Sequence, residues 1–287
     1  MVSLTTAHVV APSLGRHIVD DLIIERAPKL AASPAWPVLR LVLYRLLDYR
    51  KARRMADTIQ PMTGQAALDY VSGLLALDVA VEGLERVPTT GPIVTISNHP
   101  TGIADGVAVY DALKRVRTDL IFFANADAHR VAPGFADILI PVELNNSKRS
   151  REATRLTLQR TNTALEAGRA LVTFPSGRLA RKRDGVLTDE PWMPTAVTLG
   201  RRFHAPLVPI HVAGPWSFLF HFFDGFSGEL RDITLFHELL NKRGQHFRIV
   251  IGEPIDADAV PGEPVEAIKR LKQFVEFDMA AGRLRFE

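Results

Sequence analysis

From about residue 80 onward, the sequence alternates between short apolar stretches and longer stretches with the spacing of amphipathic helices. Strands that alternate with helices build a sheet whose faces are covered by those helices. The sequence therefore predicts an α/β fold with a mixed, mostly parallel sheet flanked by helices. The expected strands are 77–83, 91–97, 119–125, 137–144, 169–175, 205–214 and 247–255, and the later expected helices are 151–168, 191–203 and 264–282.

The first 79 residues lack this alternation. Their apolar residues recur at helical spacing, which predicts helices at 14–31, 38–55 and 65–77. We therefore expect an N-terminal helical region, residues 1–79, that is able to associate with a membrane, and an α/β domain, residues 80–287.

A histidine and an aspartate stand where an apolar strand passes into a helix. The sequence Asn98-His99-Pro100 follows the strand, and Asp105 comes six positions after His99. If Gly102 turns the chain into the helix, the carboxylate can reach the imidazole, which gives the His–Asp half of a catalytic triad. The alternative is a polar residue at a strand end and a carboxylate favoured at a helix start.

A second polar block follows the strand at 169–175. It reads Phe174-Pro175-Ser176-Gly177-Arg178 and continues into a basic run that ends at Arg183. Turn amides and nearby arginines can hold a phosphate or an oxyanion. The alternative is a surface turn with solvated charges.

A cationic turn follows the strand expected at 137–144. It contains Lys148, Arg149 and Arg151 ahead of a helix, and helix starts bind anions through their free amides. The alternative is that Asn146 or Ser147 only caps the helix.

The order of these blocks resembles the glycerolipid acyltransferase family, which includes glycerol-3-phosphate and lysophosphatidate acyltransferases. The sequence places Asn-His-Pro…Asp first, then the cationic turn, then Phe-Pro-Ser-Gly, and then Val-Pro-Ile around Pro209. The resemblance covers about residues 80–255. Pro209 interrupts the strand expected at 205–214, which by itself indicates a sheet edge or a sheet end.

The resemblance implies transfer of a fatty acyl group from acyl-CoA or acyl carrier protein to an alcohol or amine of a lipid precursor, such as a lysophosphatidate-type or lyso-ornithine-lipid-type acceptor. No further cofactor and no metal are expected. It implies that His99 is the general base and that Asp105 orients it. The residues expected to bind substrate are Asn98, Gly102, Lys148, Arg149, Arg151, Phe174, Pro175, Ser176, Gly177, Arg178 and Pro209.

The sequence departs from the commonest family pattern at three places. Five residues instead of four separate His99 from Asp105, Ser176 stands in place of the usual glutamate, and Arg178 lies one position early. The first departure resembles the branch that includes ornithine-lipid acyltransferases and hemolysin-like relatives. Because position 176 lacks the usual carboxylate, the motifs support acyl transfer as the reaction more firmly than they support any particular acceptor.

The N-terminal segment 36–54 combines a run of apolar residues with arginines, as interfacial helices do. It is too charged to span a bilayer, and residues 1–17 lack the pattern of a secretion signal. We expect a peripheral enzyme at the cytoplasmic face of a membrane. The aromatic segment 214–226 is expected to line an acyl tunnel, to enter the interface, or to pack in the core, and segment 36–54 could instead pack on the sheet.

The remaining features exclude several classes of protein. The chain has no cysteine, so disulfides and cysteine nucleophiles are excluded, and its nine histidines lack zinc-ligand spacing. No phosphate-binding loop of a nucleotide-binding protein occurs. Two other hypotheses stay open: an inactive lipid-binding adaptor on the same scaffold, and nucleic-acid binding through 178–183, which we do not expect.

Overall fold

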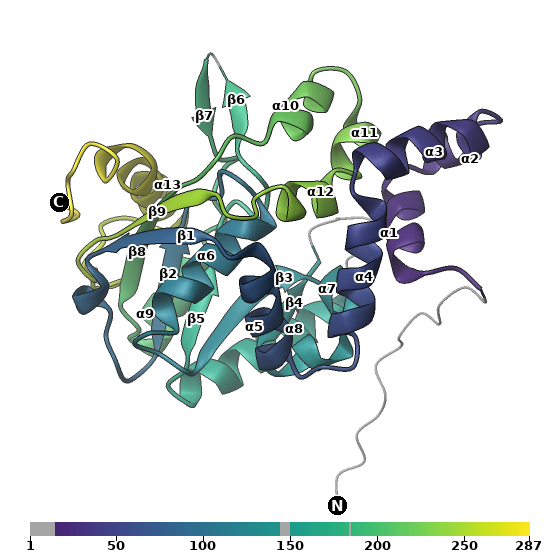
Figure 1. Cartoon of the computed structure of the whole chain (residues 1–287). Coiled ribbons are helices and arrows are strands. Elements are labelled where there is room, and N and C mark those ends of the chain that lie inside the picture. Colours follow the sequence, from purple (N-terminus) through teal and green to yellow (C-terminus); the bar gives the residue numbers. More distant parts are fainter. Residues whose placement is uncertain (1–14, 144–149, 184) are drawn as a thin grey trace, which may run out of the picture.

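The computed structural model describes residues 15–143, 150–183 and 185–287 (Figure 1). The described chain begins with helices that lie along one side of the molecule. They bury apolar residues such as Val19, Leu43 and Leu75. These helices are α1 (Ile18–Arg26), α2 (Pro28–Ala32), α3 (Trp36–Leu46), α4 (Tyr49–Ile59) and α5 (Gly64–Leu75).

Two of the expected N-terminal helices are each broken into two. The helix expected at 14–31 is interrupted at Ala27, because Pro28 cannot donate a helical hydrogen bond and instead begins α2. The helix expected at 38–55 is interrupted at Asp48, whose φ of 54° is left-handed. The Asp48 carboxylate contacts Lys51 in the next turn and His237 of helix α12 (Leu235–Leu240), so a tertiary contact helps to hold the break in place.

Within the described residues, the main sheet has seven strands in the order β1-β9-β8-β2-β5-β3-β4. The five strands from β8 to β4 run parallel to one another, and β9 and β1 run in the opposite direction. The expected mixed, mostly parallel α/β fold is therefore confirmed. The strands are β1 (Asp78–Glu82), β2 (Ile93–Ser97), β3 (Leu120–Asn125), β4 (Leu139–Val142), β5 (Ala170–Thr173), β8 (Leu207–Ala213) and β9 (His246–Ile251); β6 (Arg181–Arg183) and β7 (Val186–Thr188) form a separate hairpin that the sequence did not predict.

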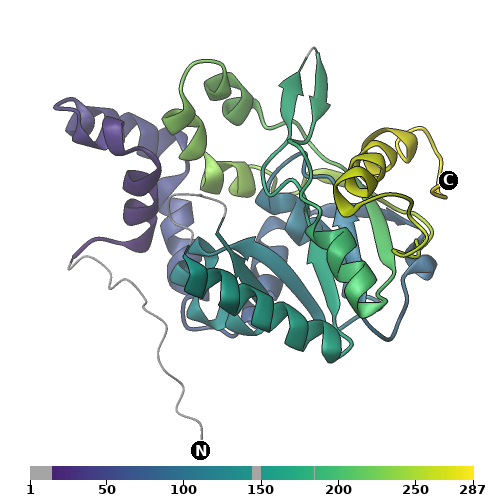
Figure 2. The ribbon, with the colours of Figure 1, turned by 180° about the vertical axis from the view of Figure 1, so that it is seen from behind.

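Helices cover both faces of the sheet, as alternating side chains require. On β2, Ile93 faces the core shared with α6, whereas Val94 and Ile96 face the core shared with α8, α9 and α13. Figure 2 shows the face with α8, α9 and α13. The remaining helices are α6 (Ile103–Leu113), α7 (Asp127–Val131), α8 (Arg151–Glu166), α9 (Thr195–Phe203), α10 (Phe218–Asp224), α11 (Gly228–Asp232), α12 (Leu235–Leu240) and α13 (Pro264–Gln273), with 3-10 turns at Leu84–Arg86 and Pro133–Asp137 and a π-helical turn at Phe274–Asp278.

The N-terminal helices do not stand apart from the sheet. Helix α5 ends at Leu75 and β1 begins at Asp78, so helices give way to strands near the expected boundary at residue 80. Leu75 and Val71 belong to the same buried cluster as Ile93. The helical region and the α/β region therefore share one core.

The expectation that Pro209 marks a sheet edge or end is wrong. Pro209 lies in β8, which is flanked by β2 on one side and β9 on the other. It is opposite Ile96 of β2, and its carbonyl accepts a bond from the Gly252 amide just past the end of β9. Pro209 has no amide proton to donate to a neighbouring strand. This costs little here, because the hydrogen-bonded pairing of β8 with β9 begins only at Ile210.

Candidate active site

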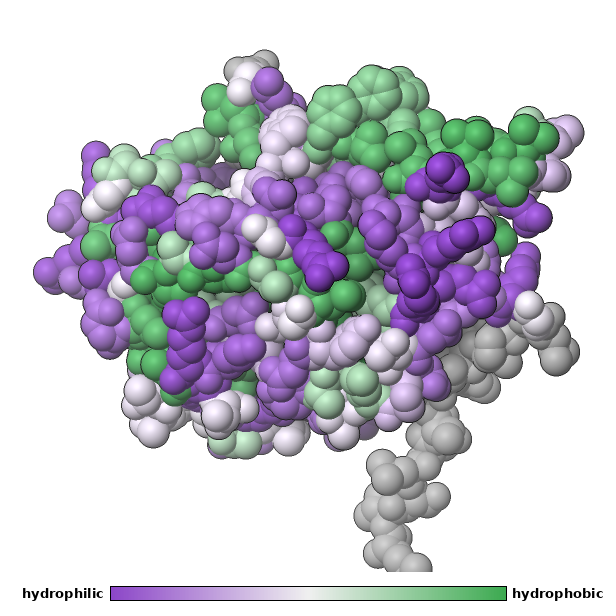
Figure 3. All heavy atoms as spheres, in the orientation of Figure 1, coloured by the Kyte–Doolittle hydropathy of each residue, from purple (hydrophilic) through white to green (hydrophobic). Residues whose placement is uncertain are grey.

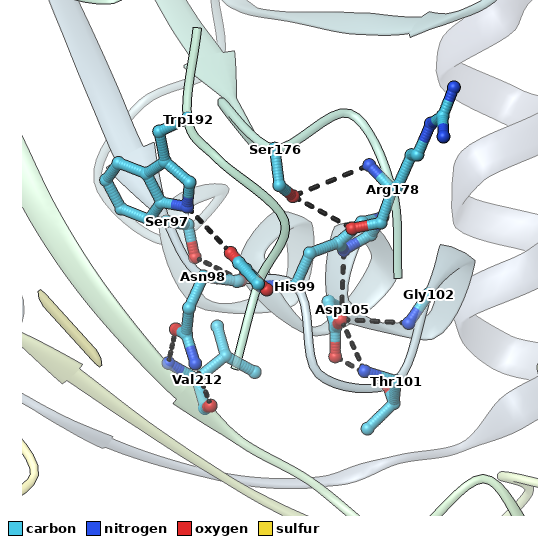
Figure 4. Close-up of polar contacts among 11 residues, drawn as sticks. Ser97, Asn98, His99, Thr101, Gly102, Asp105, Ser176, Arg178, Trp192 and Val212 are labelled. Carbon is cyan, nitrogen blue, oxygen red and sulfur yellow. Dashed lines mark hydrogen bonds and ion pairs between the residues drawn. The ribbon is translucent and has the colours of Figure 1, made fainter. Parts of the chain in front are cut away.

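His99 follows the carboxyl end of β2, and Asn98 fixes the point where it leaves the sheet. The Asn98 side chain donates from Nδ2 to the Val212 carbonyl (2.9 Å) and accepts from the Val212 amide at Oδ1 (2.7 Å). These two hydrogen bonds add a side-chain connection between the end of β2 and β8 (Figure 4). Asn98 was expected to bind substrate, but its amide is occupied in positioning the turn.

Asp105 faces His99 from the first turn of α6. Its Oδ2 lies 3.0 Å from His99 Nδ1 and also accepts bonds from the amides of Thr101 (2.8 Å) and Gly102 (3.0 Å). Its Oδ1 accepts from the Thr101 hydroxyl (2.5 Å). The Asp105 side chain is fully buried, whereas that of His99 is 17% exposed. The expected contact between imidazole and carboxylate is present (Figure 4).

The turn between the two groups depends on Gly102. Its φ is 86°, which is the left-handed region that favours glycine. A Cβ at this position would lie 2.8 Å from Cδ1 of Leu179. Gly102 therefore contributes backbone geometry and a close approach to the segment after Arg178, both of which a side chain would disturb.

The Phe174–Arg178 block lies against His99, since β5 is the neighbour of β2. The Phe174 ring packs on the imidazole with 4.4 Å between ring centroids. Farther along, the Ala180 amide donates to the His99 carbonyl (2.9 Å). These contacts bring together two sequence blocks that are more than 70 residues apart.

Ser176 and Gly177 close a tight turn. The Ser176 hydroxyl donates to the Arg178 carbonyl (2.8 Å) and accepts from its amide (3.4 Å), and the Gly177 amide donates to the Phe174 carbonyl (2.9 Å). Both amides are thus occupied inside the turn, which argues against the expected oxyanion role for them. The Arg178 side chain extends away from the Ser176 hydroxyl (Figure 4).

Asp189 is a site residue that the sequence reasoning missed. The residue is 4% exposed, and its carboxylate accepts the His99 amide at both oxygens (3.1 and 3.2 Å). The Trp192 indole donates to the same carboxylate (2.8 Å). Burial, followed by the negative charge of Glu276, raises the pKa of Asp189 to about 7. Its only local signal is a Leu-Thr-Asp-Glu-Pro sequence after a short strand, which does not indicate a partner 90 residues away.

Strand β4, which precedes the cationic turn in the sequence, ends at the same edge of the sheet as β2. Lys148 and Arg149 fall outside the described residues. Arg151 is exposed at the start of α8, and Ser150 caps that helix by accepting the Ala153 amide (3.0 Å). Strand β4, which precedes this helix, is three positions from β2 in the sheet, or roughly 14 Å. The role of Arg151 in substrate binding stays a prediction.

Metal ligation and membrane spanning can be checked over the described residues. In the ranges 15–143, 150–183 and 185–287, His, Asp and Glu side chains form no group of three that could hold a metal ion. No helix in these ranges is long and apolar enough to cross a membrane.

The arrangement is suited to proton transfer. Because Nδ1 of His99 is engaged by Asp105, Nε2 is the nitrogen left to take a proton from a substrate. The buried carboxylate can stabilise the imidazolium that forms. An imidazole paired with a buried carboxylate thus lies at the edge where parallel strands end, a common place for ligands in such sheets.

Known proteins with similar sequences act on lysolipids. Two lyso-glycine lipid O-acyltransferases are similar: that of Phocaeicola vulgatus is 29% identical over 73% of this chain and 74% of its own, and that of Bacteroides thetaiotaomicron is 24% identical over 70% and 76%. Among solved structures, the 1-acyl-sn-glycerophosphate (LPA) acyltransferase PlsC from Thermotoga maritima is 15% identical, with a TM-score of 0.49 over 94% of this chain and 98% of that one.

The family resemblance is confirmed over nearly the whole chain. Residues 22–282 match the family described as Acyltransferase, a range that includes the turn of His99, the Phe174–Arg178 block and Asp189. The chain belongs to the Acyltransferase family.

Proposed function

We propose that this acyltransferase moves a fatty acyl group from a thioester, either acyl-CoA or acyl carrier protein, to a hydroxyl of a lysolipid. The observation that supports this most is the 3.0 Å contact between His99 Nδ1 and the buried Asp105 carboxylate, with the imidazole still partly exposed. Both the donors and the lipid acceptor would meet at the cytoplasmic face of the membrane.

In this mechanism His99 acts as general base and then as general acid. Its Nε2 takes the proton of the acceptor hydroxyl as the oxygen attacks the thioester carbonyl. The C–S bond then breaks, and the imidazolium returns the proton to the departing thiolate. Asp105 stabilises the intermediate positive charge from the opposite side of the ring.

The acceptor we favour carries an amino-acid headgroup. Two similar proteins are lyso-glycine lipid O-acyltransferases. In this chain Ser176 replaces an acid with a hydroxyl that bonds only within its own turn, and the adjacent Arg178 is exposed. A site that has lost a negative charge beside an arginine suits a headgroup carboxylate.

A screen of acceptors tests this assignment. We expect one labelled acyl thioester to be consumed with a lyso-glycine or lyso-ornithine lipid at least about tenfold faster than with lysophosphatidate or glycerol 3-phosphate, a difference of ~1.4 kcal/mol. Free-thiol release and labelled lipid product are measured together. Preference for lysophosphatidate would contradict the headgroup proposal, and no thiol release with any acceptor would favour the lipid-binding adaptor.

We further propose that the enzyme docks on the bilayer through an apolar docking surface. Helices α3 and α10 and the residues that flank α10 contribute it; Leu41 of α3 is 68% exposed and Phe218 of α10 is 64% exposed. Figure 3 shows a continuous hydrophobic area over α2, α3, α10 and α11, bordered by hydrophilic residues. The exposed residues that form the docking surface are Val38, Leu41, Val42 and Leu46 with Trp216, Phe218, Phe222 and Phe226.

Polar contacts join the two halves of the docking surface to each other and to the site. Glu229 of α11 accepts the amides of Lys29 (3.0 Å) and Leu30 (2.9 Å) at the start of α2. Arg181 of β6 lies 3.9 Å from Asp224 of α10, and the adjacent Ala180 contacts His99. The docking surface and the site therefore lie on the side where the parallel strands end (Figure 1). A patch of this kind marks an interaction site.

Serine substitutions test the docking surface. We expect Leu41→Ser/Val42→Ser and Phe218→Ser/Phe222→Ser each to lower the partition coefficient onto anionic vesicles at least about tenfold, because each buried apolar side chain contributes ~1.5–3 kcal/mol. Vesicle co-sedimentation measures this. Val265→Ser, which changes an exposed apolar residue of α13, is the matched control. If all three variants bind vesicles equally, the docking surface is misassigned.

A further inference from the structure

His99 is held by two buried carboxylates that act on different parts of the residue. Asp105 contacts the imidazole, whereas Asp189 accepts the main-chain amide at 3.1 and 3.2 Å. Asp189 directly follows β7, so the segment after the β6–β7 hairpin contacts the turn that carries His99. The peptide that positions the imidazole therefore depends on a carboxylate from a distant segment.

Asp189 is in turn connected to the C-terminal helices. Glu276, in the π-helical turn, accepts the Asp189 amide (2.6 Å) and the Thr188 hydroxyl (3.0 Å), and Lys272 of α13 bonds to the same Glu276. The charged or titratable groups around Asp189 are thus His99, Glu276 and Lys272, and His211 of β8 interacts electrostatically with Glu276. One cation and two carboxylates share this buried space.

We propose that the carboxylate of Asp189 is a positioning residue for acyl transfer, holding the main chain of His99 so that the imidazole meets the acceptor, and that Glu276 tunes its charge. This inference rests on the proposed role of His99. Both hydrogen-bond donors that face Asp189, the His99 amide and the Trp192 indole, lack any capacity to accept. A protonated acid would therefore lose part of this contact, and displacements near 1 Å can cost about a hundredfold in rate.

Asp189→Asn keeps the shape but removes the charge. With its oxygen in the place of Oδ2, an asparagine still accepts from the Trp192 indole and the His99 amide, but its NH2 group then takes the place of Oδ1 and faces the His99 amide, donor against donor. We expect kcat to fall about 10- to 100-fold with KM for the donor and the acceptor unchanged. If the substitution only reduced the fraction of folded protein, less enzyme would be active, but no pH-dependent change linked to Asp189 would appear.

The fluorescence of Trp192 can report the protonation of Asp189. In a Trp36→Phe/Trp216→Phe background, Trp192 is the remaining tryptophan and bonds to Asp189. We expect its fluorescence to titrate near pH 7, where burial and Glu276 place the pKa of Asp189. Glu276→Gln removes the like charge, so the transition should move to lower pH by about one unit. The part of the kcat–pH profile that follows Asp189 should move by the same interval. In Asp189→Asn this part of the profile and the fluorescence transition should both be lost.

Asp119→Asn is the matched control, because it removes a carboxylate paired with buried Arg117 (2.7 Å) at the other end of the sheet. It should leave the fluorescence transition and kcat unchanged. Wild-type kcat in Asp189→Asn at every pH, or an unmoved transition in Glu276→Gln, would overturn the proposal. Failure of the proposed function looks different: His99→Ala would stay active, while the Trp192 titration would be unaffected.

Discussion

Replacement of His99 by alanine should lower acyl transfer by about 10³- to 10⁴-fold while the protein stays folded. Proton transfer by a positioned base contributes on this scale. The fold should survive because the imidazole is partly exposed and Asp105 keeps the Thr101 and Gly102 amides as donors. The measurement is kcat/KM with a labelled acyl thioester, with circular dichroism to verify folding.

A second His–Asp pair provides the control for this prediction. His204 and Asp258 lie 3.2 Å apart on the surface, so His204→Ala removes the same side chain without touching the site. We expect His204→Ala to keep wild-type activity. Wild-type activity in His99→Ala would rule out the general-base mechanism.

Asp105→Asn should separate charge from shape. With its oxygen in the place of Oδ2, the asparagine still accepts from His99, Thr101 and Gly102, and its amide can donate to the Thr101 hydroxyl. The variant should therefore fold normally but lose about 10²- to 10³-fold in kcat, because the imidazolium is no longer stabilised by a negative charge. Steady-state kinetics and thermal unfolding measure the two effects.

Asp105→Ala is the comparison that tests this reasoning. It leaves the Thr101 and Gly102 amides buried without their acceptor, which should cost ~2 kcal/mol or more of unfolding free energy in addition to the activity. Equal stabilities of the Asn and Ala variants would show that Asp105 does not organise the turn. Wild-type kcat in Asp105→Asn would show that its charge has no role.

Local patterns predicted most of the fold. Apolar runs located every strand of the main sheet, and the mixed, mostly parallel arrangement followed from their alternation with helices. The order of strands in the sheet does not follow from such patterns, so the expectation of a sheet edge or a sheet end at Pro209 is wrong, because β8 lies between two strands. The break at Asp48 depends on His237, a contact 189 residues away, and a helical pattern cannot reveal it.

In the candidate site, too, some residues could be predicted from the local sequence and others could not. His99 and Asp105 could be paired from sequence because a glycine and a helix start lie within six positions of each other. Phe174 could be placed near them only through the family resemblance, and its ring contact with His99 comes from the adjacency of β2 and β5. Neither a local pattern nor the family resemblance indicated Asp189. It follows the β6–β7 hairpin and contacts the site by accepting the main-chain amide of His99.

The apolar surface of α3 and α10 (Figure 3) is connected to the site of His99 through Asp224, Arg181 and Ala180. An enzyme seated on a bilayer by that surface would leave the acyl tails of its acceptor among the surrounding lipids while the headgroup rises to the imidazole. Encounters would then take place in two dimensions. Diluting the acceptor with inert lipid would slow turnover even when the total amount of acceptor in the tube is constant.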